Sequence, residues 1–75
     1  MVENIDYTSA VYEYLRTLGD PGDEVITAIR PWLEKTYDLG YPDAARIRRI
    51  AMNELSAQGK VERLNTRGRY VRILD

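Results

Sequence analysis

The apolar residues of this chain change their spacing near Gly59. Before Gly59 they recur at intervals of three and four residues, which is the spacing of helices that bury one face. After Gly59 they fall in two short runs, 61–64 and 70–74, with Asn65 and Gly68 between them. Two such runs joined by residues that tolerate positive φ predict a β-hairpin. The sequence therefore predicts an α+β fold.

A chain of 75 residues is long enough for one small domain, which we place at 1–75. We expect residues 1–6 to be flexible and a first helix to follow them. Its possible N-caps are the side chains that accept a hydrogen bond from an unpaired backbone N–H, namely Asp6, Thr8 and Ser9. Gly19 suits the left-handed position that ends many helices.

The middle of the chain predicts a short strand and two further helices. Residues 25–27 are β-branched throughout, which favours a strand. The second helix begins after Thr27, which we favour as its cap, or at Pro31, where the missing N–H costs nothing. Gly40 breaks this helix, and after a short turn a third helix covers 42–57, which Gly59 ends.

The third predicted helix separates into two arcs on a helical wheel. The apolar arc, expected to face the core, contains Ala44, Ile47, Ile50, Ala51 and Leu55. The polar arc on the other side contains Arg46, Arg49 and Asn53, and Arg48 lies at the edge between the arcs. The rest of the predicted core includes Tyr14, Leu15, Trp32 and Leu33.

Charge is divided unevenly along the chain, although the formal net charge is only −1. Residues 1–40 carry three cationic and eight anionic side chains, a net charge of −5. Residues 41–75 carry eight cationic and four anionic side chains, a net charge of +4. The second half can therefore present a basic face on a nearly neutral protein.

The segment "IRRIAMNELSAQGKVERL", followed by a hairpin rich in Arg and Gly, resembles the winged helix-turn-helix family of DNA-binding proteins. Leu55, Gly59 and Val61 stand where that family commonly has Leu, Gly and an aliphatic residue. The resemblance implies three helices and a C-terminal hairpin, the wing. It also implies sequence-specific binding of double-stranded DNA, with helix 42–57 in the major groove and wing 61–74 on the backbone or minor groove. A transcriptional regulator is the expected function.

The side chains of the third helix suit this expectation. Arg46 and Arg49 can fork onto guanine, Asn53 can pair with adenine, and Arg48 is better placed for a phosphate. At the wing tip the candidates are Arg67, Gly68 and Arg69, and further candidates for the DNA backbone are Tyr41, Arg63 and Arg72. Each set has another interpretation. Charged arcs are often solvated faces, hairpin charges prevent edge pairing, and Tyr41 is more often a packing residue.

The composition excludes several other kinds of chemistry. The chain has no Cys and no His, which excludes disulfides, thiol nucleophiles and imidazole bases, so we expect neither an enzyme nor a cofactor. The alternative function is a winged-helix protein–protein interaction module that uses its acidic first half or its basic second half.

The expected setting of the protein follows from features that the sequence lacks. It has no long apolar run, so we expect no membrane partner, and "MVENIDYTSA" lacks the pattern of a signal peptide, so we expect a cytoplasmic protein. We expect a monomer or a weak homodimer, because no long helix is left over for dimerisation.

Overall fold

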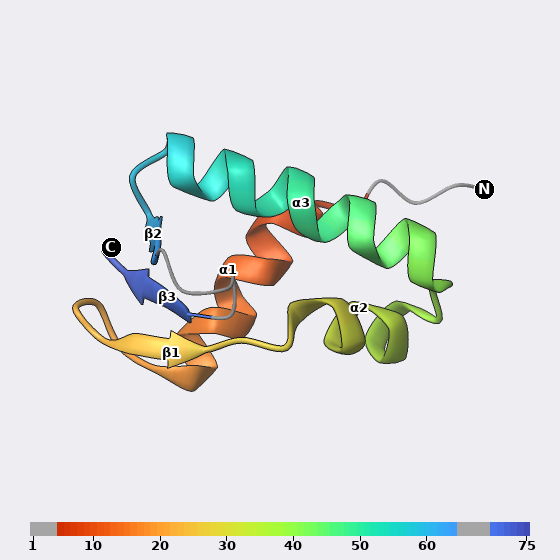
Figure 1. Ribbon diagram of the computed structural model, residues 1–75, viewed down its shortest axis with the longest axis horizontal. Helices are drawn as coiled ribbons and strands as arrows, with labels where there is room; N and C mark the ends of the chain where they lie inside the picture. The colour runs from red at the N-terminus through yellow and green to blue at the C-terminus, as the bar shows by residue number, and fades with distance from the viewer. Residues whose placement is uncertain (1–4, 65–69) are drawn as a thin grey trace.

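The computed structural model describes residues 5–64 and 70–75 of the chain. In chain order the elements are α1 (Tyr7–Leu18), β1 (Glu24–Ile26), α2 (Ile29–Tyr37), α3 (Tyr41–Ala57), β2 (Val61–Arg63) and β3 (Tyr70–Ile73). Figure 1 shows α3 running along the molecule, with the sheet near its C-terminal end and α2 near its N-terminal end. The predicted α+β class is confirmed.

The strands form one antiparallel sheet with the order β1-β3-β2 in the described part of the chain. Val25 of β1 lies opposite Val71 of β3, and Val61 of β2 lies opposite Ile73. All four of these side chains are buried. The short strand predicted at 25–27 is therefore present, one residue earlier, and it extends the sheet formed by the two strands of the hairpin.

α1 begins at a capping side chain. Asp6 Oδ1 accepts a hydrogen bond from the Ser9 backbone N–H at 3.1 Å, and Asp6 Oδ2 accepts one from the Ser9 hydroxyl at 2.7 Å. The hydrogen bond from the Ser9 hydroxyl, followed by the one from its backbone N–H, holds the pKa of Asp6 below its ordinary value of 3.8. Of the three possible caps, Asp6 is the one used.

Gly19 follows α1 and was expected in a left-handed conformation, but the structure shows otherwise. Its φ is −174° and its ψ is 175°, an extended conformation that any residue adopts. Space requires the glycine instead, because a Cβ at this position would lie 2.8 Å from Cγ1 of Val25. Gly19 therefore allows the chain after α1 to pass close to β1.

Both ends of α2 differ by one or a few residues from their predicted positions. The N-cap is Ala28 rather than Thr27, and its side chain makes no capping hydrogen bond. Pro31 is the third residue of the helix, where its missing N–H has no intrahelical partner to lose. At the other end the left-handed residue is Asp38, with φ 57°, and Gly40 is instead the N-cap of α3.

α3 ends as predicted at Gly59, which has a φ of 73°. The Gly59 N–H donates to the carbonyl of Ser56 at 3.1 Å, and the Lys60 N–H donates to the carbonyl of Leu55 at 3.0 Å. This pair of bonds is the Schellman arrangement, which satisfies carbonyls at a helix end and reverses the chain. It directs the chain from α3 into β2.

The core confirms most of the predicted apolar positions and corrects one. Leu15, Leu33, Ala44, Ala51 and Leu55 are at most 1% exposed. Ile50, however, is 48% exposed, and Met52, which lies outside the predicted apolar arc, is 3% exposed. α3 packs against α1 and α2 and also against β2, which turns its buried arc toward Met52 and away from Ile50.

Two predicted core aromatics lie at the rim of the core. Tyr14 and Trp32 are partly buried and stack on each other, with ring centroids 4.5 Å apart and planes 16° apart. Trp32 also meets Tyr37 edge to face. The stacked pair joins α1 to α2, and the contact of Trp32 with Tyr37 lies within α2.

Candidate nucleic-acid interface

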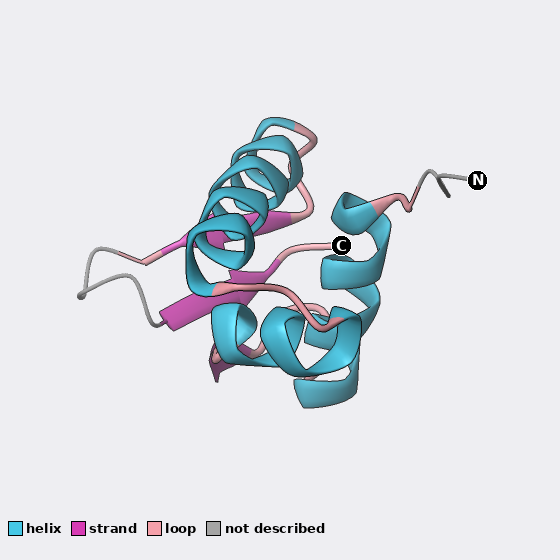
Figure 2. Cartoon of the chain, turned by 90° about the vertical axis from the view of Figure 1, so that its right-hand side faces the viewer, coloured by secondary structure: helices cyan, strands magenta, loops and turns pink. Residues whose placement is uncertain are grey.

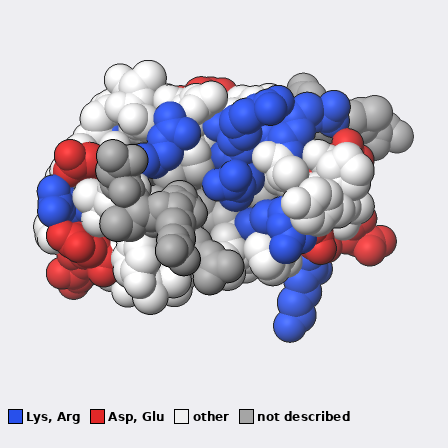
Figure 3. Space-filling view, in the orientation of Figure 1, with Lys and Arg blue, Asp and Glu red and all other residues white. Residues whose placement is uncertain are grey.

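The exposed side of α3 carries Arg46, Arg48 and Arg49. The Arg46 side chain is 61% exposed, and its Nη2 lies 3.0 Å from Oδ1 of Asp43. An exposed pair one helical turn apart contributes only about 0.2–0.5 kcal/mol, so this guanidinium can exchange Asp43 for another anion. Figure 3 shows Lys and Arg side chains gathered in the middle of the face along which α3 runs.

Arg48 and Arg49 have no ion-pair or side-chain hydrogen-bond partner within residues 5–64 and 70–75. Both are exposed. Their positive charges are therefore not compensated by a carboxylate of the described chain. Such guanidiniums are suited to binding an external anion or a base edge.

Asn53 and Arg63 connect α3 to β2. Arg63 Nη2 donates to Asn53 Oδ1 at 2.7 Å, and both residues are exposed. The sequence predicted a pairing of Asn53 with adenine, but here its carbonyl oxygen already accepts from Arg63. The geometry therefore favours Asn53 as a residue that positions Arg63 beside α3.

Arg72 lies in an ion network on the outer face of the sheet. Its Nη2 is 2.6 Å from Glu24 Oε2 on β1, and its Nη1 is 2.7 Å from Glu62 Oε1 on β2. The pKa of Arg72 is raised, first by the hydrogen bond to Glu24 and further by the charges of both carboxylates. Two carboxylates surround one cation, so this placement does not support the predicted contact of Arg72 with a DNA backbone.

Tyr41 is the first residue of α3 and is 63% exposed, so its ring does not pack in the core. The Arg30 guanidinium lies over its ring, 4.5 Å from the centroid. Arg30 also pairs with Glu34. The sequence did not indicate that Arg30 lies next to Tyr41 at the start of α3, because only the packing of α2 against α3 brings the two residues together.

Three predicted candidates of the wing tip, Arg67, Gly68 and Arg69, lie outside the described residues. The strand ends that flank them are joined, since the Leu64 N–H donates to the Tyr70 carbonyl at 3.1 Å. Figure 2 shows α3 and this end of the hairpin on the left, and α1, which begins near the end marked N, on the right. The described ends of β2 and β3 therefore lie on the side of the molecule on which α3 lies.

Comparison of the chain with protein-family models, with curated proteins and with solved structures found no match. Among residues 5–64 and 70–75, no helix has both the length and the apolar character needed to cross a membrane. The same residues contain no group of three or more acidic side chains arranged to hold a metal ion.

Proposed function

We propose that the protein binds double-stranded DNA in a sequence-specific manner and acts as a transcriptional regulator. The observation that carries this proposal is the exposed side of α3, where Arg48 and Arg49 have no partner in the described chain and Arg46 has only an exposed pair with Asp43. Backbone phosphates supply most of the affinity in DNA binding, and arginine is the side chain that forks onto both phosphate and guanine.

The order of the elements supports this use of α3. A helix, a strand, two helices and a two-stranded hairpin follow one another, which is the order on which the resemblance to the winged helix-turn-helix family rests. Only residues 38–40 separate α2 from α3. In that arrangement the second helix of the pair enters the major groove, whose width admits a helix.

The proposed roles differ among the arginines. Arg46 and Arg49 read base edges, and Arg48, at the flank of the helix, binds a phosphate. Arg63, held by Asn53, binds the backbone beside α3. Figure 3 shows acidic side chains toward the two ends of this face, so the local field favours an approach of DNA to its middle.

Titration of a mixed-sequence duplex at several salt concentrations tests the proposal. If about four phosphates are neutralised, the logarithm of the binding constant falls with the logarithm of salt with a slope of about −3.6. Arg48→Ala should make the slope shallower by about 1, whereas Lys35→Ala, which removes an exposed charge from α2, should leave it unchanged. Absence of binding at low salt would overturn the proposal and favour the protein-interaction alternative.

A further inference from the structure

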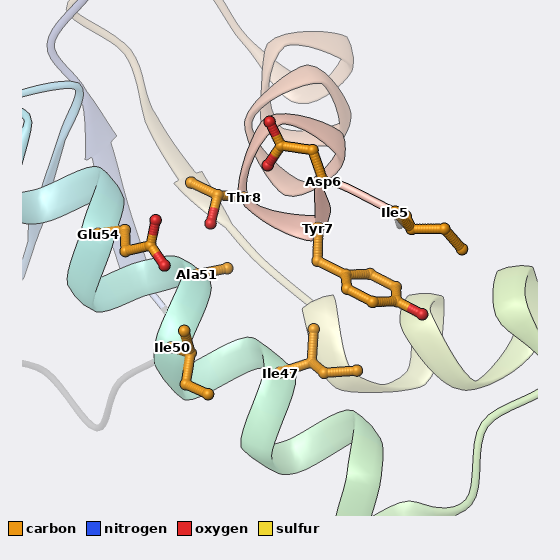
Figure 4. Close-up of a pocket in the computed structure, with 8 residues that line it drawn as sticks. All are labelled: Ile5, Asp6, Tyr7, Thr8, Ile47, Ile50, Ala51 and Glu54. Carbon is orange, nitrogen blue, oxygen red and sulfur yellow. The ribbon is translucent and has the colours of Figure 1, made fainter. Parts of the chain in front are cut away.

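A hollow of about 260 Å³ lies between the beginning of α1 and the middle of α3. Its apolar lining is Ile5, Tyr7, Ile47, Ile50 and Ala51 (Figure 4). Ile5 is 38% exposed and Ile50 is 48% exposed. Aliphatic side chains this exposed beside a hollow form an apolar surface that a partner can cover.

Ile50 stands between opposite charges on one stripe of α3. Arg46 precedes it by four residues and Glu54 follows it by four, so the three side chains lie along the same face of the helix. All three are exposed, and the Glu54 carboxylate has no ion-pair partner among the residues that the structure describes. We call Arg46, Ile50 and Glu54 the α3 stripe.

The α3 stripe is complementary to itself. If two copies cross antiparallel at Ile50, each Arg46 faces Glu54 of the other copy, because both residues lie about 6 Å along the helix axis from Ile50. Ile50 of one copy then contacts Ile50 of the other, beside the two hollows. One two-fold contact thus contains two opposite-charge pairs around an apolar centre, which is the pattern of an isologous interface.

We propose that the α3 stripe is the contact surface for a second copy of this chain, forming a weak antiparallel homodimer. The dimer rests on the exposure and charge order of the stripe and on the hollow beside it, and does not require DNA binding. Because Arg46 also belongs to the proposed DNA surface, DNA and the second copy compete for it. Dimer formation at high protein concentration therefore reduces DNA binding.

Sedimentation equilibrium without DNA, from about 10 µM to about 1 mM, tests the dimer in the range expected for a small contact. The average mass should rise from the monomer value of 8.7 kDa toward twice that value. Ile50→Asp should keep the protein monomeric over the whole range. A mass that stays at the monomer value for the unsubstituted protein would overturn the proposal.

Charge reversal then tests the pairing itself. Arg46→Glu and Glu54→Arg should each weaken the dimer by about tenfold, because each change places like charges opposite each other twice. The double variant should restore the dimer, and Lys35→Glu, an equal reversal on α2, should leave it intact. Circular dichroism checks that each variant is folded. Reversals without effect, or a double variant that stays monomeric, would contradict the pairing.

Discussion

Arg49→Ala is expected to lower the affinity for the preferred DNA sequence by about 1–3 kcal/mol and to relax the preference at one base position. Arg49 is exposed on α3 and has no partner within the described chain, so its removal leaves the fold unchanged. The loss arises because guanine O6 and N7 lose a bidentate donor. Titration of the preferred duplex and of single-base variants measures both effects.

Arg16→Ala is the matched control for Arg49→Ala. It removes the same charge from an exposed position of α1, where Arg16 contacts Tyr12 and Asp20. We expect it to change DNA affinity by much less and equally for all sequences. If Arg49→Ala also weakens every sequence equally, Arg49 is a phosphate contact and its assignment as a base reader is wrong.

Leu33→Ala is expected to reduce the free energy of unfolding by about 2–5 kcal/mol. Leu33 is fully buried in the core where α2 packs against α3, and the truncated side chain leaves a cavity. A domain of 75 residues has a total stability of roughly 4–11 kcal/mol, so this loss removes a large part of it. Urea denaturation followed by circular dichroism and by the fluorescence of Trp32 measures the change.

Leu18→Ala is the control for this core substitution. Leu18 is 41% exposed at the end of α1, and its truncation should change the stability by less than about 0.5 kcal/mol. Equal effects of the two substitutions would mean that α2 does not pack as described.

Local signals explain what the sequence predicted well. Gly59 ends α3 because a left-handed residue closes a pair of backbone hydrogen bonds there, and this depends on neighbouring residues alone. The β-branched residues around Val25 favour a strand locally, and pairing with β3 completes β1. The exposure of Arg46 and Arg49 follows from their position opposite the apolar residues of one helix.

Tertiary packing explains what the sequence missed. The exposure of Ile50 depends on how α3 divides its buried face between the other helices and β2, which the pattern of one helix does not contain. The pairing of Arg63 with Asn53 and the capture of Arg72 by two carboxylates depend on strand register. As a result, Arg63 lies beside α3, whereas Arg72 is neutralised by Glu24 and Glu62 on the sheet.

Selection of bound sequences from a random pool of duplex DNA tests most directly the claim that α3 reads DNA. The unsubstituted protein should enrich a defined motif, and the variant Arg46→Ala/Arg49→Ala should enrich a degenerate motif or none, because it lacks both proposed base readers. Recovery of the same motif by both proteins, or no enrichment by the unsubstituted protein at low salt, would contradict the claim.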